Sequence, residues 1–188
     1  MLFFCLRGMS QAIFTVGHST HTIERFIELL WRHHVGAVGD VRRHPGSQRM
    51  PQFNRLEMDE ALAGEAIRYI HFPELGGRRR PRPDTPNRGW ESEAFQGYAD
   101  HMATEEFSAD LARLDQLARE RVTAVMCAEA VWWRCHRRLI SDALLLRGWS
   151  VRHIGADGRL SEHRMTPFAV ASGLHLTYPP AQQSLNLR

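Results

Sequence analysis

The chain alternates short apolar runs with segments of helical periodicity, and no other feature restricts its fold as much. Apolar, strand-like runs occur at five places, at residues 12–16, 35–41, 67–72, 122–127 and 149–154. Between them, apolar residues recur at the spacing of an amphipathic helix, for example at Ile23, Phe26, Ile27 and Leu30. Strands that alternate with helices favour a parallel sheet. We therefore expect an α/β fold, a single-domain layered sandwich with a largely parallel central sheet flanked by helices.

The repeating pattern covers residues 12–155, which we take as the domain. Residues 1–11 form an N-terminal extension that is too short to cross a membrane and lacks the basic region and cleavage site of a signal peptide. Met1 and Met9 are both possible starts of translation. Residues 156–188 are turn-rich and poorly patterned, so we expect an irregular C-terminal tail that packs on the domain or extends from it.

Arginine is the only strongly basic residue of the chain. All 24 residues in the Lys+Arg count are arginines, and the formal net charge is +3. Chemistry that needs lysine, such as a Schiff base or a P-loop lysine, is thereby excluded. Arginine suits bidentate binding of carboxylate or phosphate, which makes an anionic small molecule or a nucleic acid a possible partner. A bias toward arginine codons explains the same composition.

The cysteine content indicates the compartment. The three cysteines, Cys5, Cys127 and Cys135, are an odd number without CxxC spacing, so a disulfide framework is not expected. We expect a cytoplasmic protein without a membrane partner. The sequence does not indicate an oligomeric state.

Polar residues directly follow three of the apolar runs. These clusters are residues 17–20 (Gly-His-Ser-Thr), 40–43 (Asp-Val-Arg-Arg) and 127–129 (Cys-Ala-Glu). Parallel strands would bring all three to one edge of the sheet, and ligands of open α/β sheets bind beyond the carboxyl ends of the strands. We therefore expect the functional site at this edge.

The helix after residue 134 should add to the same site. Cys135 and His136 continue its core-facing stripe into the first turn, which directs both side chains toward the end of the strand that carries Cys127. A helix N-terminus attracts anions, and arginines nearby would reinforce that field and lower the pKa of a cysteine. The candidate catalytic residues are His18, Cys127, Glu129, Cys135 and His136. The candidate substrate-binding residues are Ser19, Asp40, Arg42, Arg43, Arg78, Arg79 and Arg137.

Each candidate also has a purely structural interpretation. Cys127 and Cys135 can be small buried hydrophobic residues, and His136 can bond a main-chain carbonyl. Asp40 and Arg42 lie two apart on an extended segment, so they share a face and can form a structural ion pair. The arginines at 78–82 can be a solvated surface. A zinc site that combines His18 with the two cysteines and His136 fits no common ligand spacing, so we expect neither a metal nor a cofactor.

Several ordered blocks of the sequence resemble the domain of unknown function 488 family over about residues 13–154. The motifs that carry this resemblance are Gly17-His18-Ser19, Asp40-Val41-Arg42, Cys127-Ala128-Glu129 and Cys135-His136-Arg137. The resemblance implies an α/β fold and a site built from these motifs, and it implies no activity. A weaker, fold-level likeness to rhodanese-type sulfurtransferases rests on the Asp-Val-Arg motif and on a cysteine at a strand end.

Three functional hypotheses follow. The first is a small, cofactor-free enzyme, a hydrolase or a transferase, that binds an anionic, phosphorylated, nucleotide or nucleic-acid-linked substrate. In it, arginines bind the anion, Glu129 or His18 moves protons, and Cys127 or Cys135 is a possible nucleophile. The second is a thiol or sulfur-transfer protein that uses Cys127. The third is a nucleic-acid-binding module without catalysis, which the mild net charge disfavours.

Overall fold

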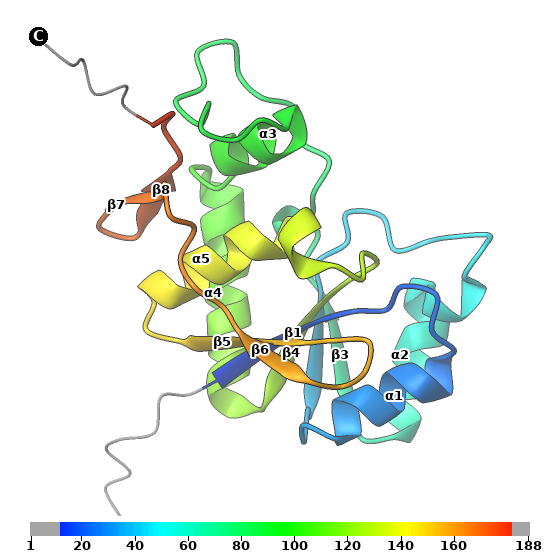
Figure 1. Ribbon diagram of the computed structural model, residues 1–188. Helices are drawn as coiled ribbons and strands as arrows, with labels where there is room; N and C mark the ends of the chain where they lie inside the picture. The colour runs from blue at the N-terminus through cyan, green and yellow to red at the C-terminus, as the bar shows by residue number, and fades with distance from the viewer. Residues whose placement is uncertain (1–11, 182–188) are drawn as a thin grey trace, which may run out of the picture.

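The computed structural model describes residues 12–181, and the N-terminal extension with Cys5, Met1 and Met9 lies outside the described residues. Its main feature is a six-stranded sheet in the order β3-β2-β4-β1-β5-β6 (Figure 1). These strands are β1 (Ala12–Gly17), β2 (Ala37–Asp40), β3 (Arg68–His71), β4 (Thr123–Cys127), β5 (Ser150–Ile154) and β6 (Leu160–Glu162). The first five are parallel, and β6 is antiparallel to β5.

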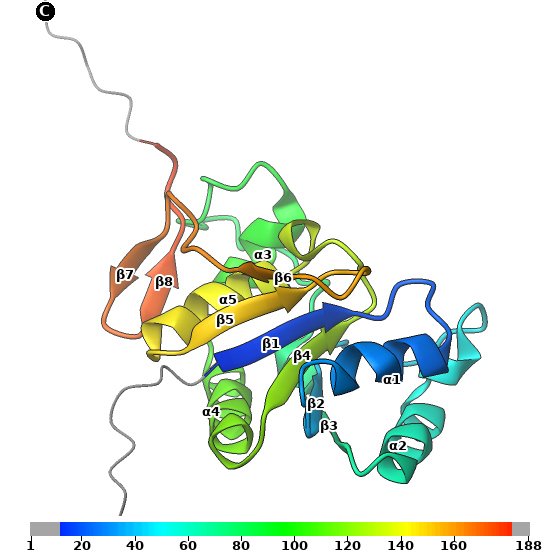
Figure 2. The ribbon, with the colours of Figure 1, turned by 60° about the horizontal axis from the view of Figure 1, so that its bottom comes forward.

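Five α-helices cover the two faces of this sheet. They are α1 (Ile23–Trp31), α2 (Arg55–Gly64), α3 (Glu93–His101), α4 (Glu105–Glu120) and α5 (Arg137–Leu146). In Figure 2, α1 and α2 lie together at the right and are separated by the strands from α3, α4 and α5. Successive residues of β1 point to opposite faces, so that Ile13 joins the core under α3, α4 and α5, whereas Phe14 joins the core under α1 and α2. The predicted α/β class is confirmed.

The register of the strands brings the polar clusters to one edge. Gly17 at the end of β1 lies beside Cys127 at the end of β4, and Asp40 at the end of β2 lies beside Met126. The ladder continues past the strands, because the N–H groups of His18 and Ser19 donate to the carbonyls of residues 127 and 128 at 3.0 Å. The polar residues after three strands are therefore neighbours in space.

The segment after Gly155 is more regular than its sequence pattern indicates. It contains β6 and a separate hairpin of β7 (Val170–Ser172) and β8 (His175–Thr177). All residues of β6 and β7 are exposed, so these strands form by main-chain pairing without burying a face. A strand of this kind leaves no alternation of apolar and polar residues in the sequence. Within residues 12–181, no helix is long and apolar enough to cross a membrane.

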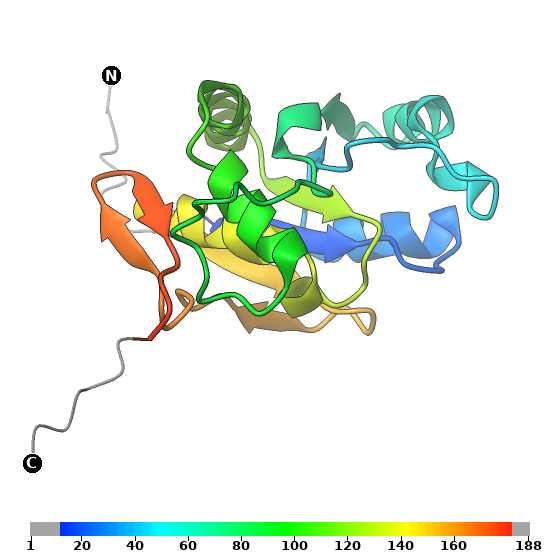
Figure 3. The same cartoon turned by 90° about the horizontal axis from the view of Figure 1, so that it is seen from above.

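The arginine-rich loop between β3 and α3 is held on α3 by a buried carboxylate. Asp100 accepts hydrogen bonds from the main-chain N–H of Arg82 at 2.8 Å, the hydroxyl of Thr85 at 2.6 Å and the amide of Asn87 at 2.8 Å. The loop also passes so close to α3 that a β-carbon on Gly97 would lie 2.5 Å from the main chain of the arginines. The loop is thus a fixed wall of the fold, seen from above in Figure 3.

A buried chain of hydrogen bonds joins the C-terminal segment to α5. The carboxylate of Asp142 accepts from Nε2 of His163 at 2.8 Å, and Nδ1 of His163 then accepts from Nε2 of His153 at 3.1 Å. Nδ1 of His153 accepts in turn from the hydroxyl of Thr15 at 2.7 Å. The ring of Trp132 stacks on His153 at 3.9 Å between centroids, which connects this chain to the loop after β4.

Candidate functional site

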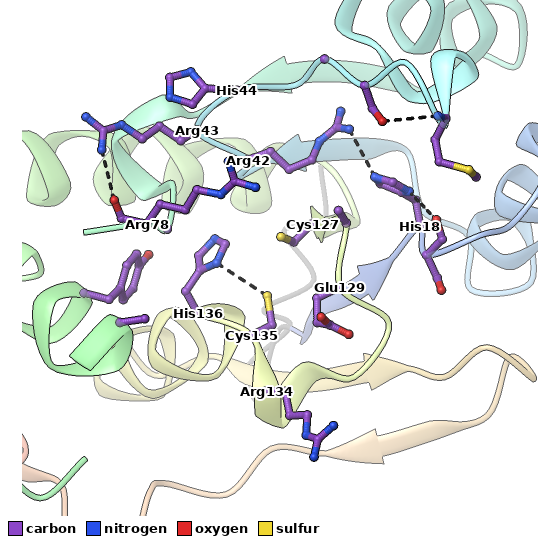
Figure 4. Close-up of a pocket in the computed structure, with 18 of the residues that line it drawn as sticks. His18, Arg42, Arg43, His44, Arg78, Cys127, Glu129, Arg134, Cys135 and His136 are labelled. Carbon is purple, nitrogen blue, oxygen red and sulfur yellow. Dashed lines mark hydrogen bonds between the residues drawn. The ribbon is translucent and has the colours of Figure 1, made fainter. Parts of the chain in front are cut away.

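A cleft of about 660 Å³ opens at the carboxyl edge of the parallel strands (Figure 4). Its floor comes from the ends of β1, β2 and β4, and its walls come from the start of α5, from α3 and from the loop after β3. Most of the candidate residues line it, namely His18, Ser19, Arg42, Arg43, Arg78, Cys127, Glu129, Cys135 and His136. Asp40, Arg79 and Arg137 are not among the lining residues.

Asp40 lies beneath the cleft and fixes Arg42. Its fully buried carboxylate accepts from Nε of Arg42 at 2.9 and 3.1 Å, from Nη2 at 2.6 Å and from the main-chain N–H of Arg42 at 2.9 Å. The hydroxyl of Tyr69 adds a bond at 2.6 Å. The pair is therefore a structural ion pair and also the support of a cleft-lining guanidinium, whose Nη1 remains directed at His18.

His18 is held as a neutral imidazole with a defined tautomer. Its Nδ1 lies 3.0 Å from the carbonyl of Ser19, so Nδ1 carries the proton, and Nε2 accepts from Nη1 of Arg42 at 3.3 Å. Burial and then the charge of Arg42 lower the pKa of His18 to about 4. The ring also stacks on Phe53 at 4.1 Å between centroids. These contacts make His18 a rigid support for Arg42.

Two thiols and one imidazole meet at the floor of the cleft. Sγ of Cys127, Sγ of Cys135 and a ring nitrogen of His136 all lie within 4.8 Å of one another. Nε2 of His136 donates to the carbonyl of Val41 at 3.0 Å, and Nδ1 faces Sγ of Cys135 at 3.6 Å, where it can take the proton of that thiol (Figure 4). Both cysteines are buried and free of a disulfide. The sulfur of Cys135 thus has a second thiol and an imidazole as its polar neighbours.

The surroundings distinguish the two thiols. The adjacent Cys127 thiol, together with His136 and Arg137, outweighs burial and holds the pKa of Cys135 well below its ordinary value. The interaction with Cys135, and then burial, hold the pKa of Cys127 well above its ordinary value. Cys135 is therefore the thiol of the pair that is more easily converted to a thiolate, and Cys127 is the thiol that keeps its proton.

Arg137 supplies the positive charge behind this thiolate. Only 1% of its surface is exposed, its Nη2 donates to the main-chain carbonyls of Glu129 and Ala130, and its Nε has no hydrogen-bond partner. No carboxylate forms an ion pair with it among residues 12–181. A buried cation without a carboxylate is stabilised by an adjacent thiolate, so Arg137 acts on the site from behind the cleft wall.

The start of α5 differs in detail from the sequence expectation. The helix begins at Arg137, because residues 132–134 form a 3₁₀ turn in which Cys135 N–H bonds the carbonyl of Trp132 at 3.1 Å. Cys135 itself has extended main-chain angles, and His136 occupies the position before the helix. Both side chains still face the cleft, but neither is part of a regular helical turn.

The entrance of the cleft carries an excess of positive charge. Its exposed arginines are Arg43, Arg49, Arg78 and Arg134, and Glu129 is the one carboxylate among the lining residues. Arg43 also donates to the carbonyl of Arg78 at 3.3 Å, which joins two of these side chains across the entrance. Such a cleft concentrates anions.

Two lining residues have left-handed main-chain angles, although neither is glycine. Ser19 has φ of 47° and Arg78 has φ of 61°. Residues other than glycine rarely adopt these angles, because the conformation costs energy. Such strain occurs mainly where the position of the main chain or side chain is functionally constrained. Ser19 follows β1, and Arg78 lies where the loop after β3 turns over the cleft. His34 and Ala66, in the turns after α1 and α2, share this conformation without lining the cleft.

The cysteines and His136 are the one group among residues 12–181 whose spacing could hold a metal ion. They would supply three ligands, which is the number in catalytic zinc sites.

Sequence reasoning missed one wall of the cleft. Phe95 and Tyr98 of α3 line it, as do residues of the turn-rich segment 44–50. Tyr98 donates to the carbonyl of Leu75 at 2.8 Å, and its ring lies 5.0 Å from that of His136. In the sequence, the residues of this wall have the pattern of ordinary core or loop positions, and no neighbouring motif indicates that they belong to the site. Arg134 carried a weak signal, as a basic residue next to Cys135.

The fold and the cleft define a small α/β protein with a cysteine-histidine-arginine site at the carboxyl edge of a parallel sheet. The family model described as domain of unknown function DUF488 matches residues 22–144, so the chain belongs to this family. No curated protein and no solved structure matches the chain. The likeness to rhodanese-type sulfurtransferases is not supported by these comparisons.

Proposed function

We propose that this protein is a small enzyme that uses the thiolate of Cys135 as the nucleophile on an anionic substrate bound in the arginine-lined cleft. The observation that carries the proposal is the position of Cys135 at the floor of the cleft, with its sulfur 3.6 Å from Nδ1 of His136 and within 4.8 Å of the Cys127 sulfur, and with Arg137 buried behind it. Thiolates are strong nucleophiles when adjacent positive charge and hydrogen-bond donors stabilise them.

The roles of the other residues follow from their contacts. Arg42, oriented by Asp40 and His18, binds the anion from the floor, and Arg78 binds it from the entrance. His136 accepts or returns a proton at Nδ1, because its Nε2 is engaged by a main-chain carbonyl. Glu129 is exposed on the loop after β4, where it can act on water or on a leaving group.

Alkylation by a charged and an uncharged reagent tests this proposal. In a Cys5→Ser background, we expect iodoacetate at neutral pH to modify Cys135 faster than iodoacetamide does. The cationic cleft should attract the anionic reagent and raise its rate about tenfold or more. Peptide mapping assigns the modified cysteine. Cys135→Ser should abolish the rapid reaction. Cys127→Ala should move the pH profile of this reaction to higher pH, because the neighbouring thiol that lowers the pKa of Cys135 is lost.

Protection by bound anions then reports on the substrate class. Inorganic phosphate, AMP and a short single-stranded oligonucleotide are added separately before alkylation. Slower reaction in the presence of one of them supports an anionic substrate of that kind. Binding of the oligonucleotide by a chain whose cysteines are not rapidly alkylated would favour a nucleic-acid-binding module over an enzyme.

Three results would overturn the proposal. Rapid modification of Cys127 with Cys135 untouched would reverse the assignment. Modification of neither cysteine below alkaline pH would show that no thiolate is activated. Zinc that survives a chelator in a 1:1 ratio and blocks alkylation would make the cluster a metal centre.

A further inference from the structure

The second thiol of the cleft forms no bond in the proposed reaction, where it only favours the thiolate of Cys135. Cys127 ends β4 at the carboxyl edge, lines the same cleft and keeps its sulfur within 4.8 Å of both Cys135 Sγ and the ring nitrogen of His136. A cysteine with a purely structural role at a strand end does not require a second sulfur and an imidazole nitrogen within 4.8 Å of its own sulfur. A thiol beside a nucleophilic sulfur is positioned to attack any adduct formed there.

We infer that Cys127 and Cys135 carry out thiol–disulfide exchange with an anionic disulfide, in which Cys135 attacks and Cys127 resolves the mixed disulfide. The inference rests on the proposed function, since it requires Cys135 to be the nucleophile. It adds a substrate class, a disulfide with carboxylate groups, and a catalytic residue, Cys127.

The exchange balances without any further oxidant or reductant. The Cys135 thiolate attacks one sulfur of R–S–S–R, so that a Cys135–S–S–R bond forms, and the leaving R–S⁻ takes from Nδ1 of His136 the proton that Cys135 had given to it. Cys127 then gives its proton to Nδ1 of His136 and attacks Sγ of Cys135, and the second R–S group leaves and takes that proton. The two cysteines are oxidised to one disulfide, and R–S–S–R is reduced to two thiol products.

The local structure permits the closing step. The two sulfurs of a disulfide lie about 2.05 Å apart. The sulfurs of Cys127 and Cys135 now lie within 4.8 Å of each other, so they must move closer to form the bond. Cys135 lies between the 3₁₀ turn and α5 with extended main-chain angles, φ −117° and ψ 149°. Its side chain is therefore not restricted by a preceding helical turn, and a change of rotamer can bring the sulfurs together.

The charge at the entrance selects the substrate. Arg43, Arg78 and Arg134 surround the approach to the thiols, against the single carboxylate of Glu129. Arginine binds carboxylates in bidentate fashion, so a disulfide with several carboxylates should bind, and a cationic one should be repelled.

Three disulfides of different charge provide the test. The full chain with Cys5→Ser is reduced and then mixed with oxidised glutathione, which is anionic, with hydroxyethyl disulfide, which is neutral, or with cystamine, which is cationic. We expect the rate at Cys135 to fall in this order, with glutathione at least about tenfold ahead of cystamine. Mass spectrometry should find the Cys127–Cys135 disulfide as the product, with little mixed disulfide.

The Cys127→Ser variant separates this inference from the proposed function. In it, we expect one glutathione to remain on Cys135 at least about tenfold longer than in the chain that keeps Cys127. Circular dichroism shows whether the variant is folded, and Cys127→Ala is the second choice if it is not. If glutathione stays on Cys135 although Cys127 is present, the inference fails and the proposed function stands. If Cys135 forms no adduct in either chain, both fail.

Discussion

A β-carbon on Gly17 would lie 2.0 Å from the main-chain oxygen of Glu129. The loop after β4 folds back over the end of β1 at this point, and the same carbonyl accepts from the buried Arg137. Only glycine leaves room for this approach. The glycine of the Gly-His-Ser motif thus determines where Glu129 and the cleft floor lie.

Gly17→Ala should therefore displace the loop and destabilise the fold by about 1–3 kcal/mol, the usual cost of overpacking. Urea denaturation followed by tryptophan fluorescence measures the change. Gly64→Ala on α2 is the matched control, because a β-carbon there meets no atom within 4 Å. That variant should gain about 0.5–1 kcal/mol from helix propensity. Equal effects of the two substitutions would refute this explanation of Gly17.

The sequence predicted the sheet and the polar edge because both depend on local pattern. Apolar runs followed at once by polar residues locate Cys127 and Asp40 without knowledge of the rest of the fold. Tyr98 could not be found in this way, since its approach to His136 depends on how α3 packs. For Arg137 the local pattern gave the wrong role. An arginine at a helix N-terminus next to a cysteine predicts a substrate-binding residue, whereas the side chain of Arg137 points inward and donates to main-chain carbonyls.

Asp40→Asn should destabilise the protein by about 3–5 kcal/mol, because it leaves the buried guanidinium of Arg42 without its counter-charge. The carboxylate is fully buried and holds Arg42 through three hydrogen bonds from the guanidinium. Asp157→Asn provides the comparison: its ion pair with Arg159 is exposed, and we expect a loss below about 1 kcal/mol. Denaturant melts of both variants give the two values. A small loss for Asp40→Asn would mean that the ion pair is not a support of the site.

Asp100→Ala should release the arginine-rich loop from α3. Asp100 accepts three hydrogen bonds from this loop and is 6% exposed, so its loss leaves those donors without a partner. Limited trypsin digestion should then cut after Arg78, Arg79 or Arg88 at least about tenfold faster than in the parent, as local opening becomes easier. Glu93→Ala, an exposed acidic residue of the same helix, should leave the digestion unchanged. A protected loop in the Asp100 variant would show that other contacts hold it.

Acid should weaken the fold through His153. Burial, and then the neighbouring His163 and Arg137, lower its pKa from 6.5 to about 3. The unfolded chain therefore binds a proton more readily than the folded one between these values. By linkage, stability falls as the pH decreases from about 6.5 toward 3, by at most about 1.4 kcal/mol per pH unit for one such group.

The variant His153→Gln can still accept from Thr15 and donate to His163, but it cannot take up a proton. We expect it to be less stable at neutral pH, since the stacking with Trp132 is lost, and to depend less steeply on pH between about 4.5 and 6.5. Urea melts at several pH values give both slopes. The exposed His34, substituted in the same way, serves as the control. Parallel curves for the His153 variant and the parent would contradict this origin of the acid sensitivity.

The loop after β3 contains four exposed arginines, Arg78, Arg80, Arg82 and Arg88, of which only Arg78 lines the cleft. Arg78 faces the thiols across the entrance, whereas Arg80 is not among the lining residues (Figure 4). Arg78→Gln should slow the reaction of Cys135 with iodoacetate about three- to tenfold and leave its reaction with iodoacetamide nearly unchanged, because only the anion is attracted by the lost charge. Arg80→Gln should affect neither rate.

Added salt should reduce the difference between the parent and the Arg78 variant, since it screens the exposed charge. If both variants slow both reagents alike, the effect comes from the shape of the loop, and Arg78 does not select anions.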